Sequence, residues 1–201
     1  VAGGAGGDAS QRILLAEASR IVNETGSVFE IRNNHRFNNW FGAESTFENH
    51  GTLRKTDSAG ETSFDVRYTG EGATELVSGT LRLIRGGSIA GPVQVDDGAQ
   101  LWLNGGTMEL TDTSGVSGDG SVRVDSGTVN VRGTWTHTGE LLLQGGIFSV
   151  LSDVVLPGIT GGPSGTLGGS GQVTVTGPFI MNGLQLTGSG EKISGGLLTI
   201  T

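Results

Sequence analysis

The fold is decided by the stretch from Gly106 to Val131, which reads GTMELTDTSGVSGDGSVRVDSGTVNV. It begins and ends with the same five-residue unit: a glycine, a variable residue, and then an apolar, a polar and an apolar residue. Alternation of this kind is typical of a strand with one buried face, because successive side chains of a strand point to opposite faces. Glycine allows the sharp turn before the strand. The unit therefore predicts a short strand after a tight turn.

This unit recurs along the chain. Its glycines are Gly51, Gly79, Gly106, Gly127, Gly146, Gly171 and Gly196, and subtraction gives intervals of 28, 27, 21, 19, 25 and 25 residues. Of the fourteen positions that alternation directs inward, thirteen are apolar and Lys55 is the exception. We interpret each interval as roughly one coil of a solenoid, because repeats of this size bury their apolar faces by stacking on their neighbours.

Further short strands are expected between these units, at residues 74–77, 93–95, 101–103, 122–124 and 141–143. The predicted fold is all-β: a single-stranded parallel β-helix, or β-solenoid, with coils of about 19–28 residues and right-handed by the usual chirality preference. We expect the solenoid over residues 21–201, after a Gly-rich lead-in and cap over residues 1–20. Residues 11–22 (QRILLAEASRIV) leave two alternatives open, a capping helix or another pair of strands.

Composition narrows the class of protein. The chain has 38 glycines and 4 prolines without a G-X-Y period, which excludes collagen. Its net charge is −8 and its 12 basic residues are not clustered, so we expect no nucleic-acid partner. No apolar run approaches the roughly 18 residues that would span a bilayer, so we expect no membrane insertion by this segment. The absence of cysteine excludes disulfides and thiolate metal sites.

The run from Thr46 to Thr56, TFENHGTLRKT, resembles the FxNxGTLxK coil of bacterial β-solenoid adhesin-type repeat proteins. Residues 126–131, 133–139 and 168–177 resemble the same surface proteins and, more loosely, autotransporter passengers and filamentous-haemagglutinin-like chains. The similarity covers about residues 21–201. It implies a secreted, extracellular or cell-surface location and carries over no catalytic residue. The chain starts without Met and its last strand pattern runs to Thr201, so we expect a segment of a longer protein.

The acidic residues could form a calcium or catalytic cluster. Parallel β-helix enzymes of the pectate-lyase type place such residues on one face, beside a basic proton acceptor. The candidates are Asp96, Asp97, Asp112, Asp119 and Asp125, with Arg85, Arg123 and Arg132 as the bases. Most fall at turn-like positions, where Asp bonds to its own backbone, and we interpret them as turn residues. A single Gly118-Asp119-Gly120 is too little for a calcium-binding repeat.

The three histidines, His35, His50 and His137, are far apart in sequence and show no arrangement of nucleophile and base. His137 lies in Thr134-Trp135-Thr136-His137-Thr138, which we predict to be an exposed strand face. The sequence predicts no catalytic residue, no cofactor and no metal site, and hence no enzyme.

Aromatic residues gather in one Asn-rich segment, HRFNNWFGAESTF, which contains Phe37, Trp40, Phe41 and Phe47. The segment could contact sugars or a partner, but we favour a hydrophobic plug or cover. Trp102 lies between two leucines and should face away from the core, where it is either an exposed sugar-stacking residue or a residue covered by a loop. The candidate contact surface is therefore Phe37, Trp40, Phe41 and Trp102.

These observations predict a structural and adhesive extracellular scaffold, a rigid rod segment of a larger surface or fibre-forming protein. Its expected partners are a glycan or a host or cell surface. Copies would also associate end to end into filaments if the terminal coils are uncapped. The alternative is a carbohydrate-binding or polysaccharide-processing β-helix, in which acidic and aromatic side chains from different coils converge in a groove.

Overall fold

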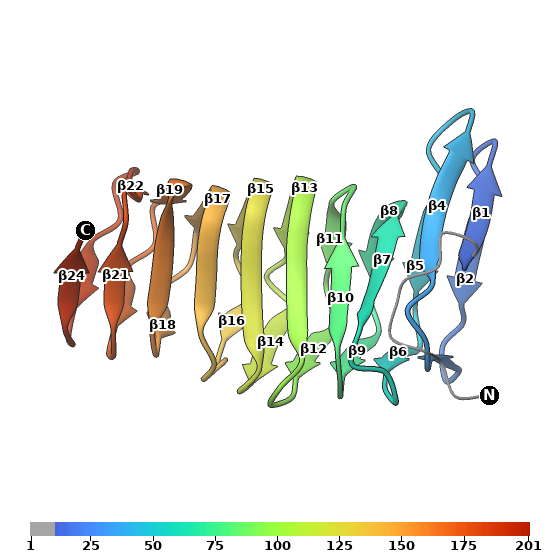
Figure 1. The fold of residues 1–201 in the computed structure, drawn as a ribbon, viewed down its shortest axis with the longest axis horizontal. Helices are drawn as coiled ribbons and strands as arrows, with labels where there is room; N and C mark the ends of the chain where they lie inside the picture. The colour runs from blue at the N-terminus through green and yellow to red at the C-terminus, as the bar shows by residue number, and fades with distance from the viewer. Residues whose placement is uncertain (1–10) are drawn as a thin grey trace.

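The computed structural model describes residues 11–201, which form twenty-four strands and no helix. The strands stack into a parallel β-solenoid of about nine turns, seen as a row of coils in Figure 1. The predicted all-β solenoid is therefore confirmed. Each coil pairs through its backbone with the coil before it and the coil after it, so the ladders run the length of the molecule.

Each coil has three faces, named here in chain order. The first face contains β1 (Arg12–Ala16), β4 (Arg36–Phe41), β7 (Glu61–Asp65), β10 (Thr80–Leu83), the first parts of β13 (Gln100–Leu110), β15 (Ser121–Val131), β17 (Leu141–Val150) and β19 (Ile159–Gly168), then β21 (Phe179–Met181) and β24 (Leu198–Ile200). The second face contains β2 (Arg20–Asn23), β5 (Thr46–Asn49), β8 (Arg67–Gly70), β11 (Gly87–Ile89), the later parts of β13, β15, β17 and β19, and β22 (Gln185–Leu186). The third face contains β3 (Val28–Ile31), β6 (Thr52–Lys55), β9 (Ala73–Leu76), β12 (Pro92–Val95), β14 (Gly115–Gly118), β16 (Thr134–Trp135), β18 (Val154–Leu156), β20 (Val173–Val175) and β23 (Lys192–Ser194).

The Gly-anchored units are strands, but they do not occupy equivalent places in the coil. The units at Gly106, Gly127 and Gly146 stack on the second face, where Met108 pairs with Val129 and Val129 with Phe148. The units at Gly79 and Gly196 lie on the first face, and those at Gly51 and Gly171 on the third. Only the intervals of 21 and 19 residues are thus coil lengths, and equating the other intervals with coils was wrong. All three faces bury alternate residues, so the same pattern arises on each.

Register gives the true coil lengths. On the first face the offset between paired residues runs from 18, between Leu142 and Thr160, to 27, between Arg36 and Ser63. Twelve of the fourteen inward positions are at most 2% exposed, and Lys55 is among them. The other two, Leu198 and Ile200, are 45% and 74% exposed on β24, whose paired neighbour among the described residues is β21.

Residues 11–22 form strands rather than a helix. β1 pairs with β4 and β2 with β5, so the solenoid ladder begins at Arg12, before the expected start near residue 21. Between these strands Glu17 and Ala18 have φ of 53° and 58°, which is incompatible with a continuous right-handed helix. Pairing with the next coil outweighs the helix propensity of Ala, Leu and Glu. The remainder of the predicted lead-in, residues 1–10, lies outside the described residues.

An aromatic cluster fills the core of the first three coils. Phe37 contacts Phe64 with ring centroids 4.4 Å apart, and Phe47 contacts Phe29 at 5.0 Å in an edge-on arrangement. Phe37 is 2% exposed and Phe47 is fully buried, which confirms the hydrophobic plug for these two residues. Including Phe37 in a contact surface was therefore wrong, because its strand position directs it inward opposite Phe64.

A buried polar row lies beside this cluster. Asn23 and Asn49 occupy the same register, and Asn23 Nδ2 donates to Asn49 Oδ1 at 2.7 Å. Gly70 takes the next place, and the hydroxyl of Tyr68 fills the space, 3.3 Å from Asn49 Nδ2 and 2.7 Å from Thr74 Oγ1. Burial raises the pKa of Tyr68 to about 12. The row satisfies amides that would be costly to leave unbonded in the core.

Candidate functional site

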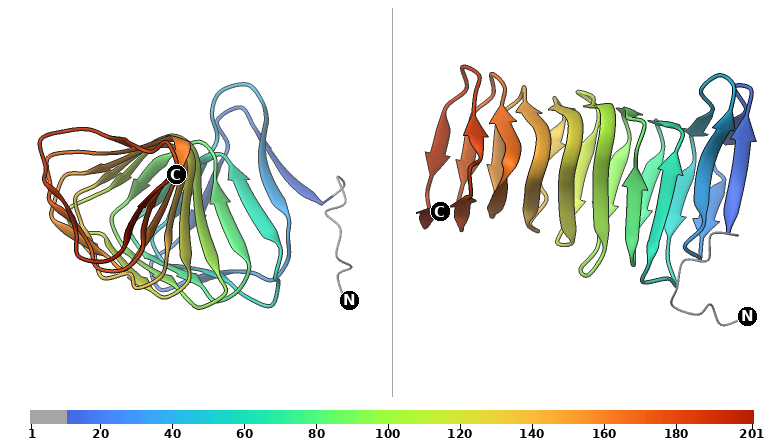
Figure 2. Two further views of the ribbon diagram at one scale, coloured as in Figure 1. Left: turned by 60° about the vertical axis from the view of Figure 1, so that its left-hand side comes forward. Right: turned by 45° about the horizontal axis from the view of Figure 1, so that its top comes forward.

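The first two coils carry an extension that we call the tongue, residues 15–19 and 39–45. Asn38 pairs with Asp65 and Thr46 with Arg67, so residues 39–45 stand where the third coil has Val66 alone. The two layers of the tongue are joined by a backbone hydrogen bond of 3.1 Å from Glu17 N to Phe41 O. Figures 1 and 2 show these loops projecting beyond the outline of the later coils.

Trp40 and Phe41 are the exposed aromatic residues of the tongue. The register between β1 and β4 shifts after Leu15, so that Asn39 and Phe41 have partners in β1 and Trp40 has none. A bulge of this kind turns a side chain away from the ladder. Trp40 is 56% and Phe41 55% exposed. The tongue therefore presents two adjacent aromatic side chains to solvent.

Trp102 lies on the outer side of the first face, as expected from its position between Leu101 and Leu103. Its indole is stacked between two guanidinium groups, with Arg82 4.1 Å and Arg123 4.4 Å from the ring centroid. These arginines occupy the neighbouring positions in register, and Arg123 is held by Asp125 at 2.8 Å. Both ring faces are thus covered by cation–π contacts, so neither face is free to stack on a sugar.

A groove runs along the corner where each coil passes from the third face to the first; we call it the corner groove. Glycine makes this corner narrow: a Cβ at Gly120 would lie 2.4 Å from Asp96 O, and one at Gly139 would lie 1.6 Å from Gly120 O. Backbone therefore stacks directly on backbone at these two glycines. Two hollows of about 380 Å³ each follow one another there and share Glu140.

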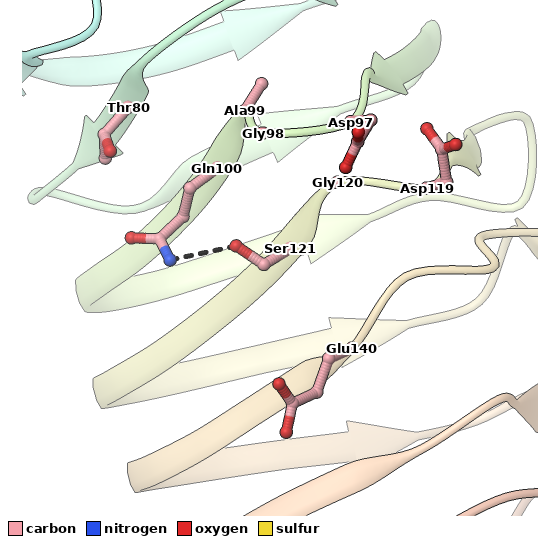
Figure 3. A pocket seen from close by; sticks show the side chains of 9 residues that line it. All are labelled: Thr80, Asp97, Gly98, Ala99, Gln100, Asp119, Gly120, Ser121 and Glu140. Carbon is pink, nitrogen blue, oxygen red and sulfur yellow. Dashed lines mark hydrogen bonds between the residues drawn. The ribbon is translucent and has the colours of Figure 1, made fainter.

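The first hollow has two rows of polar side chains, which Figure 3 shows. One row stands at the start of successive first-face strands, and in it Gln100 Nε2 donates to Ser121 Oγ at 3.0 Å. The other row lies on the turns. The lining residues are Thr80, Asp97, Gly98, Ala99, Gln100, Asp119, Gly120, Ser121 and Glu140. The second hollow is lined by Thr138, Gly139, Glu140, Pro157, Gly158, Ile159, Thr160, Pro178 and Ile180.

Of the acidic candidates, the structure brings Asp97 and Asp119 together in the corner groove. Asp125 is paired with Arg123, and Asp96 accepts a hydrogen bond from Gln94 Nε2 at 3.1 Å. Asp112 is an exposed residue after β13. Among the described residues, no group of three or more His, Cys, Asp or Glu side chains is arranged to hold a metal ion.

The basic candidates lie outside the groove lining. Arg85 pairs with Asp65 at 2.7 Å, and Arg132 lies 4.0 Å from Glu109. Glu140, which sequence reasoning missed, joins the two hollows. Its place depends on register: it precedes β17 just as Ser121 begins β15, and that alignment could be found only from the true coil lengths.

His137 is buried, contrary to the prediction of an exposed strand face. It is 2% exposed and its ring packs edge-on against Trp135, with centroids 5.6 Å apart. The strand phase is the reverse of the expected one, because Thr134, Thr136 and Thr138 face out and the residues between them face in. Burial lowers the pKa of His137, and it outweighs the opposite effects of the Gly120 backbone and Asp119.

The other two histidines are not brought near it. His50 Nδ1 lies 3.1 Å from a carboxylate oxygen of Glu71, and the two residues directly follow β5 and β8. The backbone N–H of His35 donates to Asn33 Oδ1 at 3.0 Å in a turn. The three histidines therefore form no common site.

Lys55 is fully buried at the end of β6, as its inward position requires. Its Nζ donates to the backbone oxygen of Asn33 at 3.2 Å, and no carboxylate among the described residues pairs with it. Burial lowers the pKa of Lys55 to about 8. The lysine is an internal feature of the third face and contributes to neither surface.

No stretch of the described chain forms a helix of the length and apolarity needed to cross a membrane. No family model, no curated protein and no solved structure matches this chain.

Proposed function

We propose that this chain is a structural and adhesive scaffold, a stiff rod segment that presents the tongue to a partner. The observation that carries the proposal is the combination of an unbroken ladder of about nine coils with a projecting aromatic pair at Trp40 and Phe41. Neighbouring coils share backbone hydrogen bonds and a continuous apolar core, so the rod resists bending between coils. A rigid support limits the ordering cost when its loops bind.

The expected partner of the tongue is a glycan or a host or cell surface. Two adjacent exposed aromatic side chains offer a large apolar area with little side-chain entropy to lose. The resemblance to bacterial adhesin-type repeat proteins supports a secreted, extracellular or cell-surface location for the rod. The same resemblance supports its place as a segment of a larger surface or fibre-forming protein.

Carbohydrate binding or processing along the rod is the second candidate. The observation that favours it is that Asp97, Asp119 and Glu140, from successive coils, line the same hollow of the corner groove. The groove lining includes no aromatic residue on which a sugar ring could stack. The tongue is therefore the better supported place for a contact with sugars.

The test compares Trp40→Ala/Phe41→Ala with the matched variant Ile147→Ala/Val155→Ala, which removes exposed apolar side chains elsewhere. Each protein is applied to an array of cell-surface oligosaccharides and to intact epithelial cells. We expect the tongue variant to lose binding by about tenfold or more, as for the loss of an aromatic anchor, and the matched variant to keep it. Equal loss in both variants, or no binding by the parent protein, would contradict the proposal.

A further inference from the structure

We propose that the corner groove binds an extended polypeptide segment that carries Lys or Arg at its Asp97 end and an aliphatic residue at its Pro178 end. This site is separate from the tongue and goes beyond the scaffold function. It rests on the shape of the groove, the charge of its lining and its length.

The charge of the groove favours a cationic ligand. Its three carboxylates, Asp97, Asp119 and Glu140, make no ion pair among the described residues, and none of the lining residues is basic. Elsewhere on the described chain arginine side chains pair with carboxylates, as Arg54 does with Glu75 at 2.7 Å. Carboxylates along a concave surface attract cations more strongly than the same groups on a convex one.

Charge is also divided unevenly along the rod. Residues 11–90 carry 9 basic and 10 acidic side chains, a net charge of 9 − 10 = −1. Residues 91–201 carry 3 basic and 9 acidic side chains, a net charge of 3 − 9 = −6. The corner groove therefore lies almost entirely on the strongly acidic part of the rod, which extends the attraction for a cationic segment beyond the groove itself.

The far end of the groove is apolar. Pro157, Ile159, Pro178 and Ile180 line the second hollow, together with Thr138, Thr160 and Glu140. An aliphatic side chain placed there would be withdrawn from water at about 25 cal/mol per Å² of buried area. Because the two hollows share Glu140, one ligand can occupy both of them.

The groove has the length of a short peptide. From Thr80 on β10 to Ile180 on β21 it crosses five coil-to-coil steps, through β13, β15, β17 and β19. At about 4.8 Å per step this is about 24 Å, the length of about seven residues of extended chain. Gly98, Gly120, Gly139 and Gly158 line it without side chains, which allows a second backbone to approach closely.

The test is fluorescence anisotropy with a labelled heptapeptide, Lys-Thr-Lys-Gly-Ser-Val-Leu, and the full chain at low salt. The groove variant is Asp97→Asn/Asp119→Asn/Glu140→Gln. The matched variant, Glu24→Gln/Asp112→Asn/Glu191→Gln, makes the same change in net charge at exposed carboxylates outside the groove and the tongue. We expect about tenfold weaker binding in the groove variant and a change of less than about twofold in the matched variant.

Two ligand controls complete the experiment. A peptide with Glu in place of both Lys residues should not bind, and replacing Val-Leu by Gly-Gly should weaken binding by about threefold or more. Equal weakening in the two protein variants would show unspecific attraction and overturn the proposal. So would binding of a glucosamine oligomer through the groove carboxylates when the peptide does not bind, since the ligand would then be a cationic glycan.

Discussion

Lys55 shows at the scale of one residue how the strand pattern can force a polar side chain into the core. The residue is the last of β6, and alternation from Leu53 directs it inward opposite Leu76. Its ammonium group has one backbone acceptor and no counter-ion among the described residues. Burial of a charge without a partner is destabilising. It disfavours the protonated form of Lys55 and lowers the pKa of this lysine to about 8.

The first prediction concerns the pH dependence of stability. The pKa of Lys55 is about 8 in the folded chain and 10.5 at its ordinary value, so the unfolded chain binds more protons between these pH values. Stability should therefore rise from about pH 8 toward pH 10 and be flat just below pH 8. Lys55→Met should remove this rise and stabilise the protein at pH 7 by about 1–2 kcal/mol. Urea unfolding at pH 7, 8 and 9.5 measures both effects; a destabilised Lys55→Met with the rise intact would refute the assignment.

Single residues also show where sequence reasoning reaches its limit. Alternation placed Leu53, Leu81 and Val129 in the core correctly, because period two is a local property of a strand. It placed His137 on the wrong side, because the five residues around it alternate Thr with larger side chains and either phase is compatible with the pattern. The structure resolves the choice by burying Trp135 against Phe148, with ring centroids 5.4 Å apart.

At the scale of the element, the corner between the third and first faces determines how closely coils stack. Gly139 lies directly on Gly120, and a Cβ at Gly139 would be 1.6 Å from Gly120 O. A side chain at Gly139 is therefore excluded by the backbone of the neighbouring coil.

The second prediction follows from this contact. Gly139→Ala should destabilise the protein by about 2–4 kcal/mol, because the backbone of two coils must separate to admit the methyl group. Gly158→Ala, in the same corner, is the matched change: its Cβ would be 3.4 Å from the nearest atom, Pro178 O, which is an ordinary contact. Thermal unfolding of both variants compares them. A similar loss in both would mean that tight stacking is not what the corner requires.

The candidate surfaces were only partly predictable because they depend on how strands and turns of different coils align. The aromatic segment was found from its composition, but its division into buried Phe37 and Phe47 and exposed Trp40 and Phe41 depends on the bulge opposite Leu15. The corner groove depends on coil lengths that vary between 18 and 27 residues. Neither the bulge nor the register leaves a local mark in the sequence, so Glu140 could not be aligned with Ser121 in advance.

At the scale of the whole molecule, the rod has a structured tongue at one end and an acidic groove along most of its later coils. Both surfaces follow from the stacking of coils on three faces, which the sequence pattern could not distinguish. The tongue and the groove lie on different coils and use different chemistry, so each can be altered without the other. Their positions depend on the register between neighbouring coils.

The measurement that tests this register most directly is a disulfide between neighbouring coils, and the absence of cysteine from the chain makes the result unambiguous. Glu109 and Asn130 are paired residues of β13 and β15, and their side chains are joined by a hydrogen bond of 2.6 Å. In Glu109→Cys/Asn130→Cys the Cα atoms should be about 4.8 Å apart, within disulfide range. In Glu109→Cys/Arg123→Cys the second residue lies on another face of the coil. We expect rapid oxidation of the first pair and none of the second; oxidation of the second pair, or failure of the first, would contradict the three-faced stack.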